Sequence, residues 1–380
     1  MSARMVLTNA QVVTRHEAFR GTVVVEDGLV RAVEPGRSAV RGALDLAGDY
    51  LLPGIVELHT DVLEKHWAPR PGVQWPATAA VAAHDAQLAS AGITTVLDGL
   101  AVGYIIETGQ RPRDPAPFAR AIRSARDAGL LRCEHFLHMR CEVSTEWVLR
   151  DFEPFATDPM VRLVSLMDHT PGQRQFVRVD KYREYNQGKY GLSDAQMDEL
   201  IGKRLADQAR YGERHRAALV GLCQKRGLTL ASHDDATAAH VEEAVAEGIA
   251  VAEFPTTLEA ARAARAYGLA IVAGAPNLVC GGSHSGNVSA GELAAHGLLD
   301  VLSSDYVPAS ALHGAFLLHV RHGLPLPAAV AMVSLTPAER VGLDDRGEIA
   351  PGKRADLVRA RSVGDVAVVG AVWREGERIA

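Results

Sequence analysis

The sequence predicts an α/β protein built on a closed (β/α)8 TIM barrel, with a small β-sandwich domain assembled from both ends of the chain. In the middle of the chain, eight short apolar runs alternate with longer, alanine-rich helical patterns. This alternation is typical of parallel strands joined by helices. Eight such units in about 290 residues suit a barrel. A doubly wound open sheet is the alternative, and the absence of a G-x-G-x-x-G pattern after an early strand disfavours it.

Short strands are expected at both ends of the chain, and together they would form the β-sandwich domain over 1–52 and 343–380. Turn signals such as Glu34-Pro35-Gly36 and Pro351-Gly352 separate them. The predicted strands are Met5–Val13, Gly21–Val25, Ala355–Val358, Val366–Val368 and Val372–Arg374.

The barrel is expected over 53–342. Its predicted strands are the apolar runs Ile55–Leu58, Thr94–Leu97, Phe136–Arg140, Arg162–Met167, Thr229–Ser232, Ile249–Glu253, Ala270–Ala273 and Val301–Ser303. The alanine-rich stretches between them predict helices over Thr78–Ala91, Ala236–Ala246, Leu258–Tyr267 and Ala309–His322.

One polar segment, at about 171–192, interrupts this rhythm and is too long for a simple connection. It reads PGQRQFVRVDKYREYNQGKYGL, with five basic residues against two acidic ones. One interpretation is a lid that closes over an anionic substrate. The alternative is a solvated excursion or a contact between two copies of the chain.

Composition and charge exclude several classes of protein. A formal net charge of −6 argues against sequence-blind binding of nucleic acid. The chain has no apolar run of about 18 residues, so no membrane-spanning helix is expected. The N-terminus lacks the apolar segment of a signal peptide. Four scattered cysteines fit a reducing cytoplasm, and fifteen histidines point to metal or proton chemistry.

Candidate metal ligands follow the predicted strands, where a barrel gathers its functional groups. His59 and Asp61 are two residues apart and can face one cation from a single strand end. Other imidazoles and carboxylates follow strands three, four, five and eight, and they include Glu142, His169, His233 and Asp305. A lone histidine is more often a packed side chain, but the joint pattern predicts a site for zinc, manganese or iron.

Two motifs resemble the amidohydrolase superfamily. Leu51-Leu52-Pro53-Gly54-Ile55-Val56-Glu57-Leu58-His59 is similar to the opening of its barrel, and the segment Glu348–Val358 is similar to its closing signature. The sequence also resembles the phosphonate-metabolism branch through His59-Thr60-Asp61 with Glu64-Lys65-His66, Met167-Asp168-His169-Thr170 and Ser232-His233-Asp234-Asp235. Val62 departs from the branch, which often has Asn at this position, so the resemblance fixes the substrate less firmly than the metal site.

The resemblance implies a cytoplasmic hydrolase that releases pyrophosphate from a ribose methylphosphonate 5-triphosphate, a small anionic substrate. It also implies a binuclear centre, with zinc expected first. Many members bridge two metals with a carboxylated lysine, but no lysine lies between Lys65 and Lys181, so Glu142 is the expected bridge. The expected ligands are His59, Asp61, Glu142, His169, His233 and Asp305.

Asp305 is also expected to act as the general base. Cationic groups should stabilise the charge of a phosphoanhydride. The substrate-binding candidates are Lys65, His66, Arg70, Arg140, Arg174, Arg178, Lys181 and Lys189, together with His284 in a glycine-rich loop. That loop can equally be a plain turn.

Two other functions are consistent with a barrel of this kind. One is hydrolysis of a C–N bond in a cyclic amide or N-acyl compound, although the basic segment favours a polyphosphate. The other is a non-catalytic scaffold, which the full set of ligand candidates disfavours. A homodimer and a functional link to other phosphonate-degrading enzymes are expected from the resemblance alone.

Overall fold

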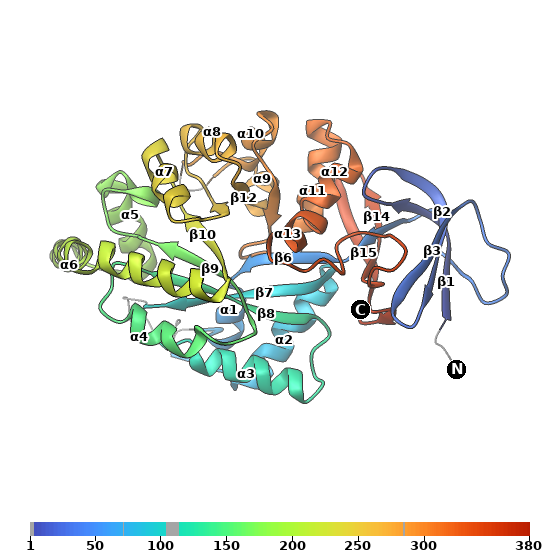
Figure 1. Ribbon diagram of the computed structural model, residues 1–380, viewed down its shortest axis with the longest axis horizontal. Coiled ribbons are helices and arrows are strands. Elements are labelled where there is room, and N and C mark those ends of the chain that lie inside the picture. The colour runs from blue at the N-terminus through green and yellow to red at the C-terminus, as the bar shows by residue number, and fades with distance from the viewer. Residues whose placement is uncertain (1–3, 71, 104–113, 284–285) are drawn as a thin grey trace.

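The structure is a computed structural model that describes residues 4–70, 72–103, 114–283 and 286–380, except for the side chain of Lys189. A ring of parallel strands surrounded by helices forms the larger part, and a second sheet lies at one end (Figure 1). Within the described part of the chain, no helix has the length and apolar character needed to cross a membrane.

The larger sheet has eight parallel strands in sequence order, and every predicted barrel strand falls on one of them. They are β6 (Ile55–Thr60), β7 (Ile93–Val102), β8 (Glu134–Glu142), β9 (Val161–Met167), β10 (Thr229–His233), β11 (Val251–Glu253), β12 (Ala270–Gly274) and β13 (Val301–Ser303). Apolar side chains of several strands, including Val56, Leu97 and Val251, pack together in the interior. The prediction of a parallel barrel is confirmed as a nearly closed one.

Glu57 joins the first barrel strand to the last. Its carboxylate accepts from the His59 backbone N–H at 2.8 Å, from Ser303 Oγ at 2.8 Å and from the Ser304 backbone N–H at 2.7 Å. An isolated parallel bridge between Thr60 and Asp305 completes the closure. The side chain of Glu57 is buried, and burial raises the pKa of its carboxyl group. The strands β6 and β13 are not joined by a continuous ladder of backbone hydrogen bonds. The buried carboxylate of Glu57 therefore closes the ring of strands between them.

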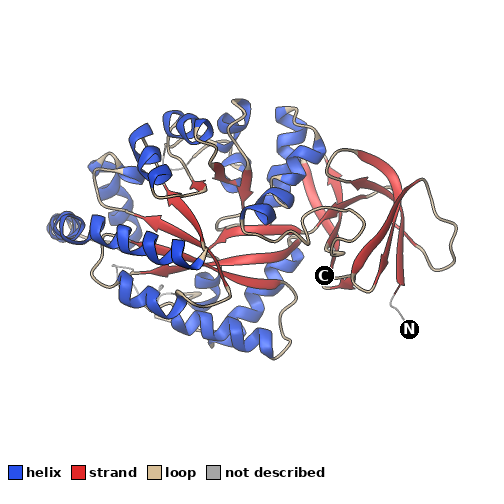
Figure 2. Ribbon diagram, in the orientation of Figure 1, coloured by secondary structure: helices blue, strands red, loops and turns tan. Residues whose placement is uncertain are grey.

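Helices cover the outside of the ring (Figure 2). They are α1 (Leu63–Trp67), α2 (Ala77–Ser90), α3 (Ala116–Asp127), α4 (Val148–Phe152), α7 (Ala238–Ala246), α8 (Leu258–Ala266), α9 (Ala275–Val279), α10 (Ala290–Ala295), α11 (Ser310–His322), α12 (Leu326–Ala331) and α13 (Leu335–Arg340), with a short 3-10 turn, η1, at Glu153–Phe155. The four predicted helices are confirmed to within one or two residues. Thr237 and Thr257 cap α7 and α8 by accepting backbone N–H groups.

The polar segment at 171–192 is helical and leads into a helix that the sequence did not predict. It contains a 3-10 turn, η2 (Arg174–Phe176), and α5 (Val179–Tyr190), and it is followed by α6 (Asp194–Arg226). Ser193 forms a capping box at the start of α6. Phe176, Tyr182 and Met197 pack in a small cluster of their own. The segment is thus a packed helical insertion.

Strands from both termini share the second sheet, whose order is β16-β15-β14-β5-β1-β2-β3, with β4 paired to β1. The strands are β1 (Arg4–Val13), β2 (Ala18–Glu26), β3 (Leu29–Pro35), β4 (Leu44–Asp45), β5 (Tyr50–Pro53), β14 (Leu357–Val363), β15 (Val366–Arg374) and β16 (Glu377–Arg378). Side chains from both halves, such as Val23 and Trp373, share one core. The Val30 N–H donates to Lys353 O at 2.9 Å, so the sheet curls onto itself.

Gly54 links this sheet to the barrel between β5 and β6. A Cβ at this position would lie 2.3 Å from Thr94 Oγ1 and 3.0 Å from the Asp356 Cβ. Only glycine therefore allows the two sheets to approach so closely at the start of the first barrel strand.

We expect Glu57→Gln to lower the free energy of unfolding by about 1–3 kcal/mol, because the amide presents N–H groups to buried donors and leaves at least one of them unpaired. Guanidinium unfolding would measure the change, with the exposed Glu17→Gln as the matched control. Equal midpoints for the two variants would show that the carboxylate does not close the barrel.

Candidate metal centre and substrate pocket

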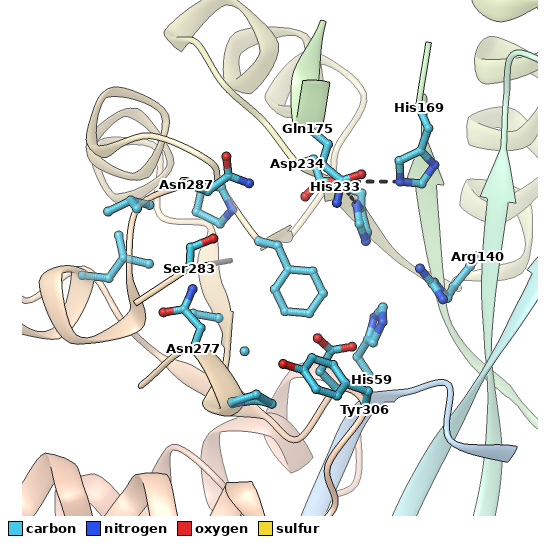
Figure 3. A pocket seen from close by; sticks show the side chains of 18 residues that line it. His59, Arg140, His169, Gln175, His233, Asp234, Asn277, Ser283, Asn287 and Tyr306 are labelled. Carbon is cyan, nitrogen blue, oxygen red and sulfur yellow. Dashed lines mark ion pairs between the residues drawn. The ribbon is translucent and has the colours of Figure 1, made fainter. Parts of the chain in front are cut away.

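A cavity of about 170 Å³ opens at the carboxyl ends of the barrel strands (Figure 3). Four of the six predicted ligands line it, namely His59, His169, His233 and Asp305. Asp61 and Glu142 lie next to this pocket, each in contact with one of its lining residues. The structure therefore brings the six predicted ligands close together. Four line the cavity, and the other two contact residues that line it.

His59 is held by a carboxylate from a different strand. Its Nδ1 lies 2.7 Å from Oε1 of Glu253, the last residue of β11. The other oxygen of Glu253 accepts from Ser165 Oγ at 2.8 Å, and that hydroxyl lies 2.6 Å from His138 Nε2. Burial would raise the pKa of Glu253, but His59 and His138 outweigh it and hold that pKa well below its usual range. This contact leaves the opposite nitrogen of His59 as its available ligand atom.

Glu142 holds His169 in the same way. Its carboxylate lies 2.6 Å from His169 Nδ1 and accepts from the His169 backbone N–H and from Arg204, each at 2.9 Å. Burial opposes charge on His169, but Glu142 and Asp234 outweigh it and raise the pKa of the imidazole to about 9. A bound metal would have to displace this proton. Arg204 comes from α6, so the unpredicted helix supplies part of the site.

His233 and Asp234 carry buried polar atoms without hydrogen-bond partners. Both ring nitrogens of His233 and Oδ2 of Asp234 are in this state, although His233 Nδ1 lies 2.9 Å from that oxygen. His169 Nε2 is 3.6 Å from the same oxygen. Buried polar atoms normally have partners. A group of nitrogen and oxygen donors that lack them fits a divalent cation.

Arg140 faces these imidazoles from β8 (Figure 3). Its Nε and Nη1 are buried without a hydrogen-bond partner, and Nη1 lies 3.7 Å from Oδ2 of Asp61. Asp305 lines the same cavity; burial raises the pKa of its carboxyl group, and the charge of Asp61 adds to the effect. The pocket thus combines imidazoles, carboxylates and a guanidinium with unsatisfied N–H groups.

The backbone is strained at three of these strand ends. Asp234, Phe254 and Asp305 have φ angles of 57°, 55° and 52°. Side-chain-bearing residues rarely adopt such conformations, which cost of order 1–3 kcal/mol each. The strain turns the chain sharply after β10, β11 and β13 and aims these residues into the pocket.

The predicted cations of the insertion are largely paired. Arg174 is buried and donates to Asp235 and to Glu243, the latter at 2.9 Å. Arg178 is paired with Asp180 and Lys181 with Glu184. The insertion is therefore a weaker positive patch than its composition indicates.

The remaining substrate candidates lie at different places. Lys65 is at the rim, where its Nζ donates to Tyr306 O at 3.3 Å. His66 faces α2, with Nε2 2.8 Å from Gln87 Oε1, and Arg70 is exposed outside the pocket lining. The side chain of Lys189 and the whole of His284 lie outside the described residues.

A second buried group of possible ligands lies between α2, β7 and β8. Asp98 lies 2.7 Å from both His84 Nε2 and His135 Nδ1. Burial opposes charge on His135, but Asp98 and Asp85 outweigh it and raise its pKa to about 9. Because Asp98 already joins His84 to His135, we interpret the group as a structural network that ties the helix to the strands, although His84 Nδ1 has no hydrogen-bond partner.

Sequence reasoning missed Glu253, Asp234 and Arg204. Glu253 ends a predicted strand and Asp234 follows a predicted ligand, so the same rule that selected the other strand ends could have found both. Arg204 gave no such signal, since its helix was not predicted.

Comparisons with known proteins agree with this geometry. The amidohydrolase family model matches residues 77–371. The chain is 47% identical over 377 residues to the alpha-D-ribose 1-methylphosphonate 5-triphosphate diphosphatase of Escherichia coli (strain K12), covering 99% of this chain and 100% of the relative.

Solved structures are similar in fold at low sequence identity. The N-acetyl-D-glucosamine-6-phosphate deacetylase of Mycobacterium smegmatis aligns with a TM-score of 0.63 and 19% identity, covering 99% of this chain and 100% of that one. The dihydropyrimidinase of Brevibacillus agri aligns with a TM-score of 0.58 and 13% identity, covering 99% and 95%.

The buried pair of Arg174 and Asp235 generates a stability prediction. Arg174→Met should lower the free energy of unfolding by about 3–5 kcal/mol, because Asp235 is left buried without its partner. The insertion should also become sensitive to limited proteolysis. Arg178→Met removes an exposed pair and should change neither property. If Arg174→Met weakens substrate binding and leaves stability intact, Arg174 is a substrate ligand and not an anchor.

Proposed function

The chain belongs to the amidohydrolase family, and we propose that it is a metal-dependent diphosphatase. Its substrate would be α-D-ribose 1-methylphosphonate 5-triphosphate, which it would convert to the 5-phosphate and pyrophosphate. The full-length similarity to an enzyme with this name supports the substrate assignment. The reaction would belong to phosphonate degradation.

Arg140 is the observation that carries the proposal. Its guanidinium is buried and lies 3.7 Å from the carboxylate of Asp61, but its Nε and Nη1 have no hydrogen-bond partner, which is costly unless an acceptor binds there. A neutral cyclic amide could accept from these N–H groups only through its carbonyl oxygens, whereas a phosphate offers several charged oxygens. The site therefore favours a phosphate-bearing substrate over a neutral cyclic amide.

We propose that two divalent ions bind here, with zinc expected first and manganese or iron as alternatives. The proposed ligands are His59, Asp61, Glu142, His169, His233 and Asp305. Their nitrogen and oxygen donors suit these metals, and the unpartnered atoms of His233 support the fit. Bound cations would lower the pKa of a water molecule and offset phosphate charge.

The side chains of the pocket then perform the remaining steps. Asp305 would accept the proton of the attacking water. The water oxygen forms a bond to the phosphorus nearest the ribose. The bond from that phosphorus to the oxygen that bridges to the second phosphate breaks, and pyrophosphate leaves. Arg140 would hold the phosphate oxygens as their charge develops, and Lys65 at the rim would attract the substrate.

The terminal sheet and the barrel are proposed to be separate units. Residues 1–52 with 343–380 would form the β-sandwich domain, and 53–342 the catalytic barrel. The shared core of the curled sheet supports this division. Cytoplasmic location, a homodimer and a link to other phosphonate-degrading enzymes stay predictions.

Purified protein loaded with zinc or manganese should release pyrophosphate from the ribosyl triphosphate. Product analysis by phosphorus NMR would identify both products, and a dihydroorotate-type cyclic amide would serve as the competing substrate. Ring opening of the amide without release of any phosphate product would contradict the proposed reaction. Less than one metal per chain, unrecovered by added metal, would indicate a scaffold.

Asp305→Asn should keep its metal content and lose turnover by at least ~10²-fold, because the amide cannot accept the proton of the attacking water. Metal analysis and kcat measured on the same preparation would separate the two effects. Asp127→Asn, which alters an exposed aspartate, is the control. Unchanged kcat in Asp305→Asn would remove this residue from the mechanism.

A further inference from the structure

A second, larger cavity adjoins the metal pocket. Its volume is about 850 Å³, and the helical insertion supplies one wall. Gln175 and Asn287 line both cavities, so the two adjoin at these side chains. Figure 3 shows these two amides on the side of the metal pocket that is away from Tyr306. The two amides are therefore within reach of a molecule bound in either cavity.

The insertion presents one face of α5 to this cavity. Lys181, Glu184, Tyr185 and Gly188 line it, and they are spaced by three and four residues. Residues at this spacing share one helix face. Tyr185 is 42% exposed, and its ring lies 5.5 Å from that of Phe176, so the wall offers aromatic surface. An exposed aromatic face in a cavity of this size fits a small organic ring.

Charge distinguishes the two cavities. Around the second one, Arg174 and Lys181 are both paired with carboxylates. In the metal pocket, Arg140 is paired with Asp61 at the longer distance of 3.7 Å, and its Nε and Nη1 have no hydrogen-bond partner. The more highly charged end of a substrate is thus favoured at Arg140, and a less charged, hydroxyl-bearing end is favoured beside the amides and the aromatic wall.

We propose that the second cavity binds the ribose and its methylphosphonate, while the leaving pyrophosphate lies on the side of Arg140. This inference rests on the proposed function. The amides of Gln175 and Asn287 would hydrogen-bond to sugar hydroxyls, Tyr185 would pack against the ribose, and Lys181 would lie near the phosphonate. The insertion is then a specificity element that recognises the part of the substrate that is not cleaved.

Two variants test the cavity by different means. Tyr185→Ala removes the aromatic wall. Gly188→Leu places a branched side chain on the cavity wall and narrows the cavity, and a Cβ at Gly188 meets no atom within 4 Å, so the helix can accept the side chain. The matched controls are Tyr267→Ala, which removes a tyrosine that is 52% exposed, and Gly202→Leu on α6, where a Cβ also meets nothing within 4 Å.

The experiment measures the dissociation constants of the two products separately, by calorimetry on the metal-loaded full chain. Both variants should weaken binding of α-D-ribose 1-methylphosphonate 5-phosphate by about tenfold, which corresponds to about 1.4 kcal/mol. Pyrophosphate binding should stay within about twofold of wild type, and the controls should bind both products normally.

Three results would overturn the inference. Weaker binding of pyrophosphate alone would place the leaving group in the second cavity. Unchanged binding of both products in folded Tyr185→Ala and Gly188→Leu would show that no substrate occupies it. A wild-type chain that binds neither product and releases no pyrophosphate would refute the proposed function and the inference with it, whereas normal wild-type turnover with unaffected variants refutes the inference alone.

Discussion

The carboxylate of Glu57 is the contact on which the site depends. It accepts from the backbone of His59 on the first barrel strand and from Ser303 and Ser304 on the last. Those two strands lack a continuous ladder, so this buried group sets their spacing. The His59 carbonyl in turn accepts from the Asp305 N–H at 3.2 Å. A candidate ligand and the candidate base thus become neighbours because one carboxylate closes the ring.

Two other carboxylates, beside the pocket, orient imidazoles. Glu253 holds His59, and Glu142 holds His169. A carboxylate on one ring nitrogen fixes the tautomer and leaves the opposite nitrogen to a metal. Much of the acidic charge near the site is therefore used to arrange ligands. Arg140 is paired with Asp61 at 3.7 Å, but its Nε and Nη1 have no hydrogen-bond partner, so it is the cation best placed to meet a substrate.

The sequence predicted the barrel well because each strand is a local apolar run. The same rule placed His59, His169, His233 and Asp305 at one end of the ring, since the carboxyl ends of parallel strands converge. It did not predict that Arg174 is paired with Asp235, which is 61 residues away and is brought close only by folding. The long helix α6 was also missed, because its polar sequence has little apolar periodicity.

The ion pairs of the basic segment at 171–192 change its expected role. Counted along the sequence, five cations in 171–192 indicate a positive lid. In three dimensions, Arg174 anchors the insertion, and Arg178 and Lys181 are balanced by acidic neighbours. A nearly neutral wall suits a sugar better than a triphosphate, whose charge is better met by metal ions and Arg140. Discrimination would then lie in the insertion and catalysis at the strand ends, so the part of the chain that recognises the substrate can vary without disturbing the part that cleaves it.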